Sequence, residues 1–227
     1  MVIYALWLMM AYTAARIGEN GEVEGSALMT AGLSNLRFFT VLSNILEGVA
    51  CLALLIAAAV SKGSAGASGA AASASDTAAS AAGRAIPLWA AELKLAAAAS
   101  VALTFITVMV FLGPMLGYKY LFTGSNLWFH GIIPIAAMVE FAFIDCYEGF
   151  PAVPFKATFT AVIPMLLYGV WYLINVIRGG MADGRFVNDW YGFAMWGIPA
   201  SLLVYVVIAA VTWLFALLLR CGNLRLR

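Results

Sequence analysis

Residues 88 to 112 read LWAAELKLAAAASVALTFITVMVFL, an apolar run that is closed by Gly113 and Pro114. A helix needs about 20 residues to cross the hydrocarbon core of a bilayer. The strands of a membrane barrel would instead alternate apolar and polar residues over about ten positions, and this run does not alternate. The segment therefore predicts a membrane-spanning helix.

Five further segments share this nearly continuous apolarity: residues 2–15, 36–60, 127–144, 157–177 and 191–219. The first is short for a span, and it lacks the positively charged start of a signal peptide. Over the 227 residues, 64% are hydrophobic and 10% are charged, whereas a soluble domain is about half apolar and about a quarter charged. The chain is therefore predicted to be all-α, a single polytopic bundle of six transmembrane helices over residues 1–227.

One internal segment has a different composition from the rest of the chain. Residues 61–83 read SKGSAGASGAAASASDTAASAAG. Runs of Gly, Ser and Ala behave as flexible linkers and cannot bury a hydrophobic core. We expect a flexible loop here, between the second and third helices, with no catalytic role.

The distribution of basic residues indicates the orientation in the membrane. An even number of spans places both chain ends on the same side, and the C-terminal tail contains Arg220, Arg225 and Arg227. Because cytoplasmic segments carry an excess of Lys and Arg, we expect a multi-pass protein of the cell membrane with both termini in the cytoplasm. The net charge of +1 argues against binding of nucleic acid through its phosphates. The oligomeric state is left open.

The scarcity of His and Cys excludes several kinds of site. The chain has one histidine, His130, and three cysteines, Cys51, Cys146 and Cys221. A single imidazole excludes HExxH metalloproteases and centres that need two histidine ligands. Three widely spaced cysteines exclude a disulfide framework and a four-cysteine zinc site. We therefore expect neither a metal nor a cofactor.

Polar residues inside apolar helices are costly, and they are candidates for function. In the second segment, Thr40, Asn44 and Glu47 are spaced i, i+4 and i+7, so they share one helical face that Ser43 flanks. In the fourth, Asn126 and His130 are spaced i and i+4. Each segment therefore carries a polar face near the point where its helix is expected to begin.

The predicted topology brings these polar faces to the same side of the membrane. The second, fourth and sixth helices all begin on the side opposite the termini, so Thr40 and His130 are expected at similar depth. A Thr hydroxyl becomes a nucleophile when a base takes its proton, and a neutral His is the natural base near neutral pH. We therefore expect Thr40 and His130 to form a catalytic pair. Other polar residues are expected on the same side: Asn44, Asn126 and Asp189 to orient the ring or hold an oxyanion, and Ser43, Glu47 and Arg178 as secondary polar groups.

Two purely structural alternatives apply to this pair. A Thr near a helix start often hydrogen-bonds to a carbonyl of its own helix. A lone His in a membrane bundle often makes one interhelical hydrogen bond and has no other role. Spacing alone does not separate these alternatives from catalysis.

Two charged residues lie deeper in the apolar segments. Lys94 is about six residues from the start of the third segment, and Glu140 is about five residues from the end of the fourth. They are at matching depth, so we expect a buried structural pair. The alternatives are a proton or ion path that includes Glu47, and a Lys94 side chain that extends to the interface.

Two motifs carry a resemblance to a known family. The segments FFTVLSN (residues 38–44) and HGIIPIAAMVE (residues 130–140) resemble the androgen-induced-gene/FAR-type family of six-helix membrane proteins and its bacterial relatives. That family consists of intramembrane threonine hydrolases that cleave fatty acid esters of hydroxy fatty acids. The resemblance implies roles for Thr40 as nucleophile and for His130 as base, followed by Pro134 and Glu140. The stretch Asn188, Trp190 and Tyr191 is similar to the closing motif of the bacterial members.

The chain also departs from the family pattern. Pro134 falls one residue earlier than in the animal proteins, and the Gly/Ser/Ala segment is foreign to the pattern. A related branch of membrane acyltransferases uses a Cys nucleophile, and Cys51 does not occupy the matching place. The leading prediction is therefore hydrolysis of a lipid ester within the bilayer by Thr40 and His130. The alternatives are a small-molecule or ion transporter or channel, and a non-catalytic membrane scaffold.

Overall fold

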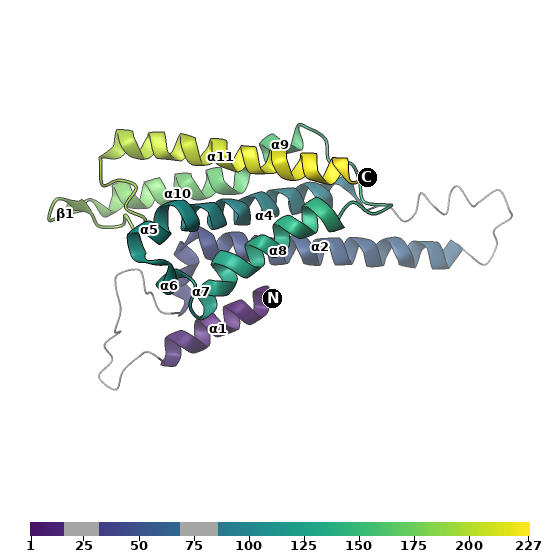
Figure 1. Cartoon of the computed structure of the whole chain (residues 1–227), viewed down its shortest axis with the longest axis horizontal. Coiled ribbons are helices and arrows are strands. Elements are labelled where there is room, and N and C mark those ends of the chain that lie inside the picture. Colours follow the sequence, from purple (N-terminus) through teal and green to yellow (C-terminus); the bar gives the residue numbers. More distant parts are fainter. Residues whose placement is uncertain (16–31, 69–85) are drawn as a thin grey trace.

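The structure, a computed structural model, describes residues 1–15, 32–68 and 86–227. Within these residues, six helical passes lie side by side and alternate in direction (Figure 1). They are α1 (Val2–Ala15), α2 (Phe39–Ser68), α4 (Leu88–Thr107), a fourth pass that contains α7 (Ser125–Leu127) and α8 (Ile133–Val139), α10 (Ile163–Gly179) and α11 (Ile198–Arg225). The shorter elements are a 3-10 helix (Gly32–Arg37), α5 (Gly113–Leu116), α6 (Tyr118–Leu121), α9 (Ala157–Thr160) and the paired antiparallel strands β1 (Met181–Ala182) and β2 (Arg185–Phe186).

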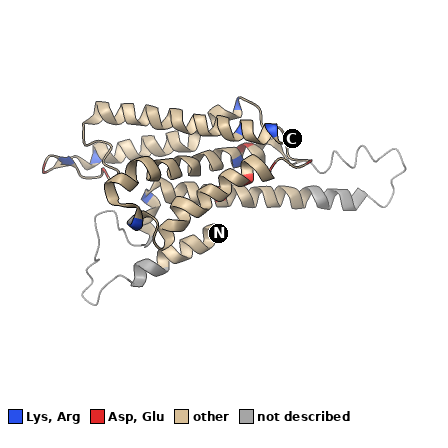
Figure 2. Cartoon of the chain, viewed as in Figure 1, with Lys and Arg blue, Asp and Glu red and all other residues tan. Residues whose placement is uncertain are grey.

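The prediction of a mostly helical chain is confirmed. Five helical stretches in the described residues are long and apolar enough to cross a membrane: Phe39–Val60, Leu88–Leu116, Ser125–Ile144, Ala157–Gly179 and Ile198–Arg225. The first pass, α1, has 14 residues and is shorter than these five. Charged residues gather toward the two ends of the helices, and the middle of the molecule is largely free of them (Figure 2). This distribution is compatible with a multi-pass membrane protein.

The helix α4 forms the centre of the bundle. It packs against α2, α8, α10 and α11, and most of its length from Ala90 to Thr104 is buried. Small side chains let neighbouring helices approach closely in a membrane bundle, and Ala97, Ala98 and Ala99 are all fully buried here. The small side chains of residues 96–99 therefore allow α4 to pack closely among its neighbours as the central helix.

Three π-helical turns interrupt the passes within the described part of the chain, at Val108–Leu112, Trp128–Ile132 and Glu140–Ile144. The first two are followed within two residues by Pro114 and Pro134, which lack the N–H that an α-helix needs. The turn before Pro134 is closed by a bond from the Ile133 amide to the Trp128 carbonyl. Such turns are frequent at functional sites, and the second one carries His130.

The last helix begins later than predicted. The expected segment started at residue 191, but α11 begins at Ile198. Residues 180–197 instead form the β1–β2 hairpin and a series of turns, in which Gly192 and Gly197 have φ angles of 74° and 90°. These left-handed conformations are incompatible with a helix. The apolar composition of this stretch therefore gave a wrong helix start.

The helix α2 also differs from the expectation at its end. It continues to Ser68, so that residues 61–68 of the predicted flexible loop are helical. Alanine is the best helix former, and it offsets the low propensity of the glycines in this stretch. The remaining residues of the predicted loop, 69–83, lie outside the described residues.

Candidate functional site

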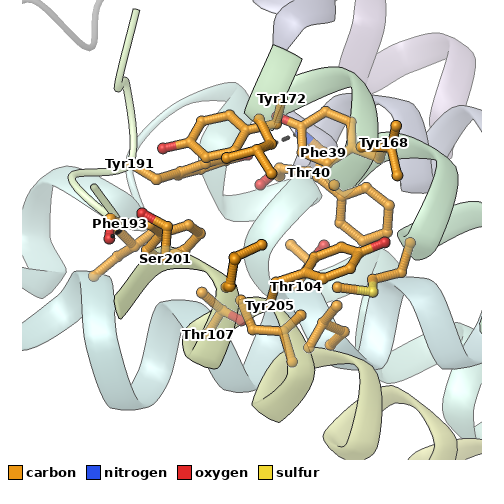
Figure 3. Close-up of a pocket in the computed structure, with 18 of the residues that line it drawn as sticks. Phe39, Thr40, Thr104, Thr107, Tyr168, Tyr172, Tyr191, Phe193, Ser201 and Tyr205 are labelled. Atoms are coloured by element: carbon orange, nitrogen blue, oxygen red, sulfur yellow. Dashed lines mark hydrogen bonds between the residues drawn. The ribbon is translucent and has the colours of Figure 1, made fainter. Parts of the chain in front are cut away.

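A cavity of about 270 Å³ lies between α2, α4, α10, α11 and the closing loop of residues 180–197. Its wall is mainly aliphatic and aromatic, with hydroxyl groups spaced around it (Figure 3). These hydroxyl groups belong to Thr40, Thr104, Thr107, Tyr168, Tyr172, Tyr191, Ser201 and Tyr205. Ligand sites are typically apolar concave spaces with a few placed polar groups. The cavity therefore suits a mainly apolar guest that carries a small polar group.

The Thr40 side chain lies on this wall beside Tyr191 (Figure 3). The Tyr191 hydroxyl accepts a hydrogen bond of 2.8 Å from the backbone amide of Phe39, at the start of α2. Burial raises the pKa of Tyr191, although interactions with Tyr168 and Thr40 oppose this rise. The phenol therefore stays neutral at physiological pH and keeps its O–H proton as a donor beside the Thr40 hydroxyl.

Aromatic residues hold Tyr191 in place. The Tyr168 hydroxyl donates to the Arg37 carbonyl at 2.7 Å and accepts from the Trp190 indole N–H at 3.1 Å. The ring of Tyr191 packs against the rings of Tyr172 and Phe193. These contacts fix the closing loop onto the head of α2.

Asp189 belongs to this closing loop and not to the surroundings of His130. One carboxylate oxygen accepts from the Tyr172 hydroxyl, and the other accepts from the Ala194 amide at 2.8 Å. The expected role of Asp189 in orienting the imidazole is therefore not supported, because both oxygens are engaged within the loop. Arg178 is exposed at the end of α10 and does not line the cavity.

Asn44 connects the two helices that carry the predicted catalytic pair. Its buried side-chain amide donates to the Thr40 carbonyl at 2.6 Å and to the Phe129 carbonyl at 3.1 Å. Phe129 directly precedes His130, so one amide nitrogen links the backbone at both positions. Asn44 thus positions the backbone, and its N–H groups do not face an oxyanion.

His130 is buried, at 8% exposure. Its Nδ1 lies 2.8 Å from the Leu121 carbonyl, and its ring packs edge-on against Phe122. A carbonyl only accepts, so Nδ1 carries the proton and Nε2 has the free lone pair that a general base needs. Asn126 is half-buried at the start of α7, and no hydrogen bond joins it to the imidazole among the described residues.

The structure does not bring the Thr40 hydroxyl and the imidazole into direct contact. Within the described part of the chain, no hydrogen bond joins Thr40 to His130, and His130 is absent from the cavity wall. The two residues lie on adjacent helices whose backbones meet through Asn44. Proton transfer from the Thr40 hydroxyl to the imidazole therefore requires a bridging water or a side-chain movement.

A polar seam continues from Thr40 along the α2–α4 interface. The hydroxyls of Ser43 and Thr104 lie 3.1 Å apart and are buried. One turn further along α4, the Ser100 hydroxyl donates to the Ala96 carbonyl at 2.8 Å. Ser43 therefore serves the helix interface, although it is close to Thr40 in sequence.

A charged cluster lies at the far end of this seam. The Lys94 ammonium is 2.6 Å from a Glu140 carboxylate oxygen and 3.0 Å from the Cys51 sulfur, and it also pairs with Glu47. The pair expected between Lys94 and Glu140 is thus present in the structure. Glu47, which was expected on the Thr40 face of its helix, is a further partner of Lys94. Glu47 lies seven residues after Thr40 in the sequence, at a depth similar to that of Lys94, and this similar depth could have indicated the contact between Glu47 and Lys94.

The same cluster has the shape of a metal-binding group. One ligand atom each from Glu47, Cys51 and Glu140 lies within 4.8 Å of the others. The Lys94 ammonium, however, already contacts all three side chains. A metal ion would meet this positive charge, so these residues fit an internal ion pair better than a metal centre.

The chain matches no protein-family model, no curated protein and no solved structure.

Proposed function

We propose that this protein is an intramembrane hydrolase that binds a lipid acyl chain in the cavity and cleaves its ester with Thr40 as the nucleophile. The observation that carries the proposal is the position of Thr40 on the wall of an apolar cavity, beside the Tyr191 hydroxyl. An apolar lining suits an acyl chain, and a nucleophile at its edge suits the ester group. A site among membrane-type helices lets such a substrate reach it from the lipid.

In the proposed reaction, the Thr40 oxygen attacks the acyl carbonyl while its hydroxyl proton passes through a bridging water to His130. His130 then gives this proton to the leaving alkoxide, which departs as the alcohol. Water attacks the resulting acyl-threonine ester, releases the fatty acid and restores the Thr40 hydroxyl. The bond between His130 Nδ1 and the Leu121 carbonyl supports this role, because it leaves Nε2 as the basic nitrogen.

Two features at the head of α2 are suited to stabilise the oxyanion. The Tyr191 O–H lies beside Thr40, and the helix N-terminus adds a positive partial charge. Donors and dipoles of this kind act where charge develops in the transition state. We propose that they replace Asn44, Asn126 and Asp189 in this role.

Ester hydrolysis by the purified protein tests the proposal. We expect Thr40→Val to abolish hydrolysis of a long-chain ester and Thr40→Ser to retain part of it, because only Ser keeps the hydroxyl. His130→Ala should lose about 10²–10⁴-fold in rate, the usual size of a general-base contribution. The matched control is Thr107→Val, which removes another hydroxyl from the same cavity wall and should leave the activity intact. Full hydrolysis by Thr40→Val, in protein free of host esterases, would contradict the proposal.

We also propose that the protein resides in the cell membrane with both termini in the cytoplasm. The five apolar helical stretches and the alternating passes support a multi-pass arrangement. A reporter fused after Arg227 that is active only in the cytoplasm should be active. If a reporter that is active only outside the cytoplasm were active at the same position, the proposed orientation would be wrong.

A further inference from the structure

The charged cluster of Glu47, Cys51, Lys94 and Glu140 is not used by the proposed hydrolysis. Lys94 is fully buried, the Glu47 side chain is 4% exposed and the Glu140 side chain is 39% exposed. The three N–H groups of the ammonium match three acceptors: Glu47 Oε1, Glu140 Oε2 and Cys51 Sγ. Each N–H group of Lys94 therefore has an acceptor, but one positive charge faces two carboxylates.

The charges within the cluster do not cancel. Two carboxylates face one ammonium, so the cluster carries one excess negative charge when both acids are ionised. The second oxygen of Glu47 is also buried without a hydrogen-bond partner among the described residues. A buried carboxylate oxygen without a donor is costly in apolar surroundings.

Groups on the neighbouring elements do not remove this excess charge. Asp145, which follows the π turn, is a third acid beside the cluster and is buried, and it interacts with Lys94, Glu47 and Glu140. The positive charge of Arg227, at the C-terminal end of the described chain, interacts favourably with the Asp145 carboxylate. The N–H groups of Arg227 donate to the Phe150 and Pro151 carbonyls and to the Asn223 side chain. Tyr147 interacts only with Asp145 in this set. Arg227 balances the charge of Asp145, so one excess negative charge remains on Glu47, Glu140 and Lys94.

A single proton restores neutrality at the lowest cost. When two carboxylates lie beside one ammonium and one of them is buried, ionisation of both is disfavoured, and the buried one, Glu47, retains a proton. A buried ion pair of one carboxylate and one ammonium is then left, which is the arrangement that apolar surroundings tolerate best. The Cys51 thiol stays neutral, because a thiolate would add a further negative charge beside the two acids.

We propose that this cluster is a proton-binding site, in which Glu47 holds one exchangeable proton that reaches water through Glu140. Glu140 is the member with substantial exposure, and it begins the π turn that ends the fourth pass. The proton therefore exchanges at the membrane face where α8 ends. This site is independent of the chemistry of Thr40.

Infrared spectroscopy of the purified full-length protein tests the proposal directly, because a protonated carboxyl group has a carbonyl band separate from that of a carboxylate. We expect the wild type to show such a band at slightly alkaline pH, to shift it on transfer to D₂O and to lose it at strongly alkaline pH. Glu47→Gln and Glu140→Gln should each lose the band, since one carboxylate and one ammonium then balance. Asp145→Asn is the matched control and should keep it.

Three outcomes overturn the proposal: a wild type without the band, a band that persists in both Gln variants, or a band that Asp145→Asn removes. The wild-type spectrum and its dependence on pH decide the matter even if one variant does not fold. Glu140→Gln replaces a partly exposed side chain by one of the same shape, so it is the variant least prone to misfolding.

Discussion

The hydroxyl of Tyr191 accepts a hydrogen bond of 2.8 Å from the backbone amide of Phe39, the residue before Thr40. This contact joins the closing loop to the first turn of α2, where backbone amides have no partner within the helix. It also sets a hydroxyl donor at the cavity wall beside the proposed nucleophile. Tyr191 thus has a structural and a chemical role that separate experiments can distinguish.

Tyr191→Phe keeps the ring and removes the hydroxyl. We expect a loss of about 1–3 kcal/mol in the free energy of unfolding, because the Phe39 amide is left without its acceptor. If the hydroxyl also stabilises the oxyanion, the rate of ester hydrolysis should fall by about 10²–10³-fold. Thermal melting and a hydrolysis assay in detergent measure the two effects.

Tyr118→Phe is the control for this change. The Tyr118 hydroxyl donates to the Met109 carbonyl at 2.8 Å on an exposed part of the molecule, and Tyr118 does not line the cavity. It should leave hydrolysis unchanged. Wild-type rates in Tyr191→Phe would remove the Tyr191 hydroxyl from the mechanism.

Lys94→Met tests how much the charged cluster contributes to the free energy of unfolding. Removing the buried ammonium leaves two carboxylates without their shared partner, a change that costs about 3–5 kcal/mol for a buried ion pair. The double variant of Lys94→Met with Glu140→Gln should lose less, because one of the orphaned charges is removed with it. Lys156→Met, at an exposed position, should have little effect. Equal losses in the single and double variants would show that Lys94 and Glu140 do not stabilise each other.

Asp145 should make stability depend on pH. Burial, with a smaller contribution from Glu140 and Glu47, raises the pKa of Asp145 from its ordinary value of 3.8 to about 6. The folded state therefore holds this proton more tightly than the unfolded state does. The resulting stabilisation is fully present below pH 3.8 and is lost as the pH rises through about 6.

In Asp145→Asn, the melting temperature should depend less on pH between 3.8 and about 6. At higher pH, the substitution should not lower the melting temperature. Melting curves at a series of pH values measure the slope. Glu148→Gln, which changes an exposed acid three residues away, should keep the wild-type slope. An unchanged slope in Asp145→Asn would assign the pH dependence to another group.

Gly169 on α10 faces the ring of Tyr205 on α11 at the cavity. A Cβ atom at this position would lie 2.0 Å from the ring of Tyr205, which also lines the cavity. We expect Gly169→Ala to cost about 1–3 kcal/mol through overpacking, more than the helix gains from alanine. Adding Tyr205→Leu should restore part of the melting temperature. If the double variant melts lower than the single one, the contact does not limit the packing.

The sequence predicted the parts of the fold that depend on composition and on counting. The apolar runs located the helices, and the alternation of passes predicted that Thr40 and His130 lie near the same membrane face. The direct contacts at the site depend on features that local patterns do not reveal. The contact of Tyr191 with α2 requires the turns at Gly192 and Gly197, and a run such as WYGFAMWG has the composition of a helix.

The charged cluster shows the same limit at the level of single residues. Depth along the helices correctly suggested that Lys94 and Glu140 meet. It did not reveal Glu47 as the second partner, because the rotation of α2 against α4 is set by packing of the Ala-rich face and not by depth. Similarly, the carboxylate of Asp189 could reach either His130 or its own loop, and only the path of residues 180–197 decides between them.

The most direct test of the central claim is to identify the residue that reacts with a fluorophosphonate probe, by mass spectrometry of the labelled protein. The proposed mechanism predicts an adduct on Thr40 in the wild type, its absence in Thr40→Val and its retention in both Thr40→Ser and Thr107→Val. An adduct on another residue such as Ser43, or equal labelling of the wild type and Thr40→Val, would contradict the assignment of Thr40 as the nucleophile.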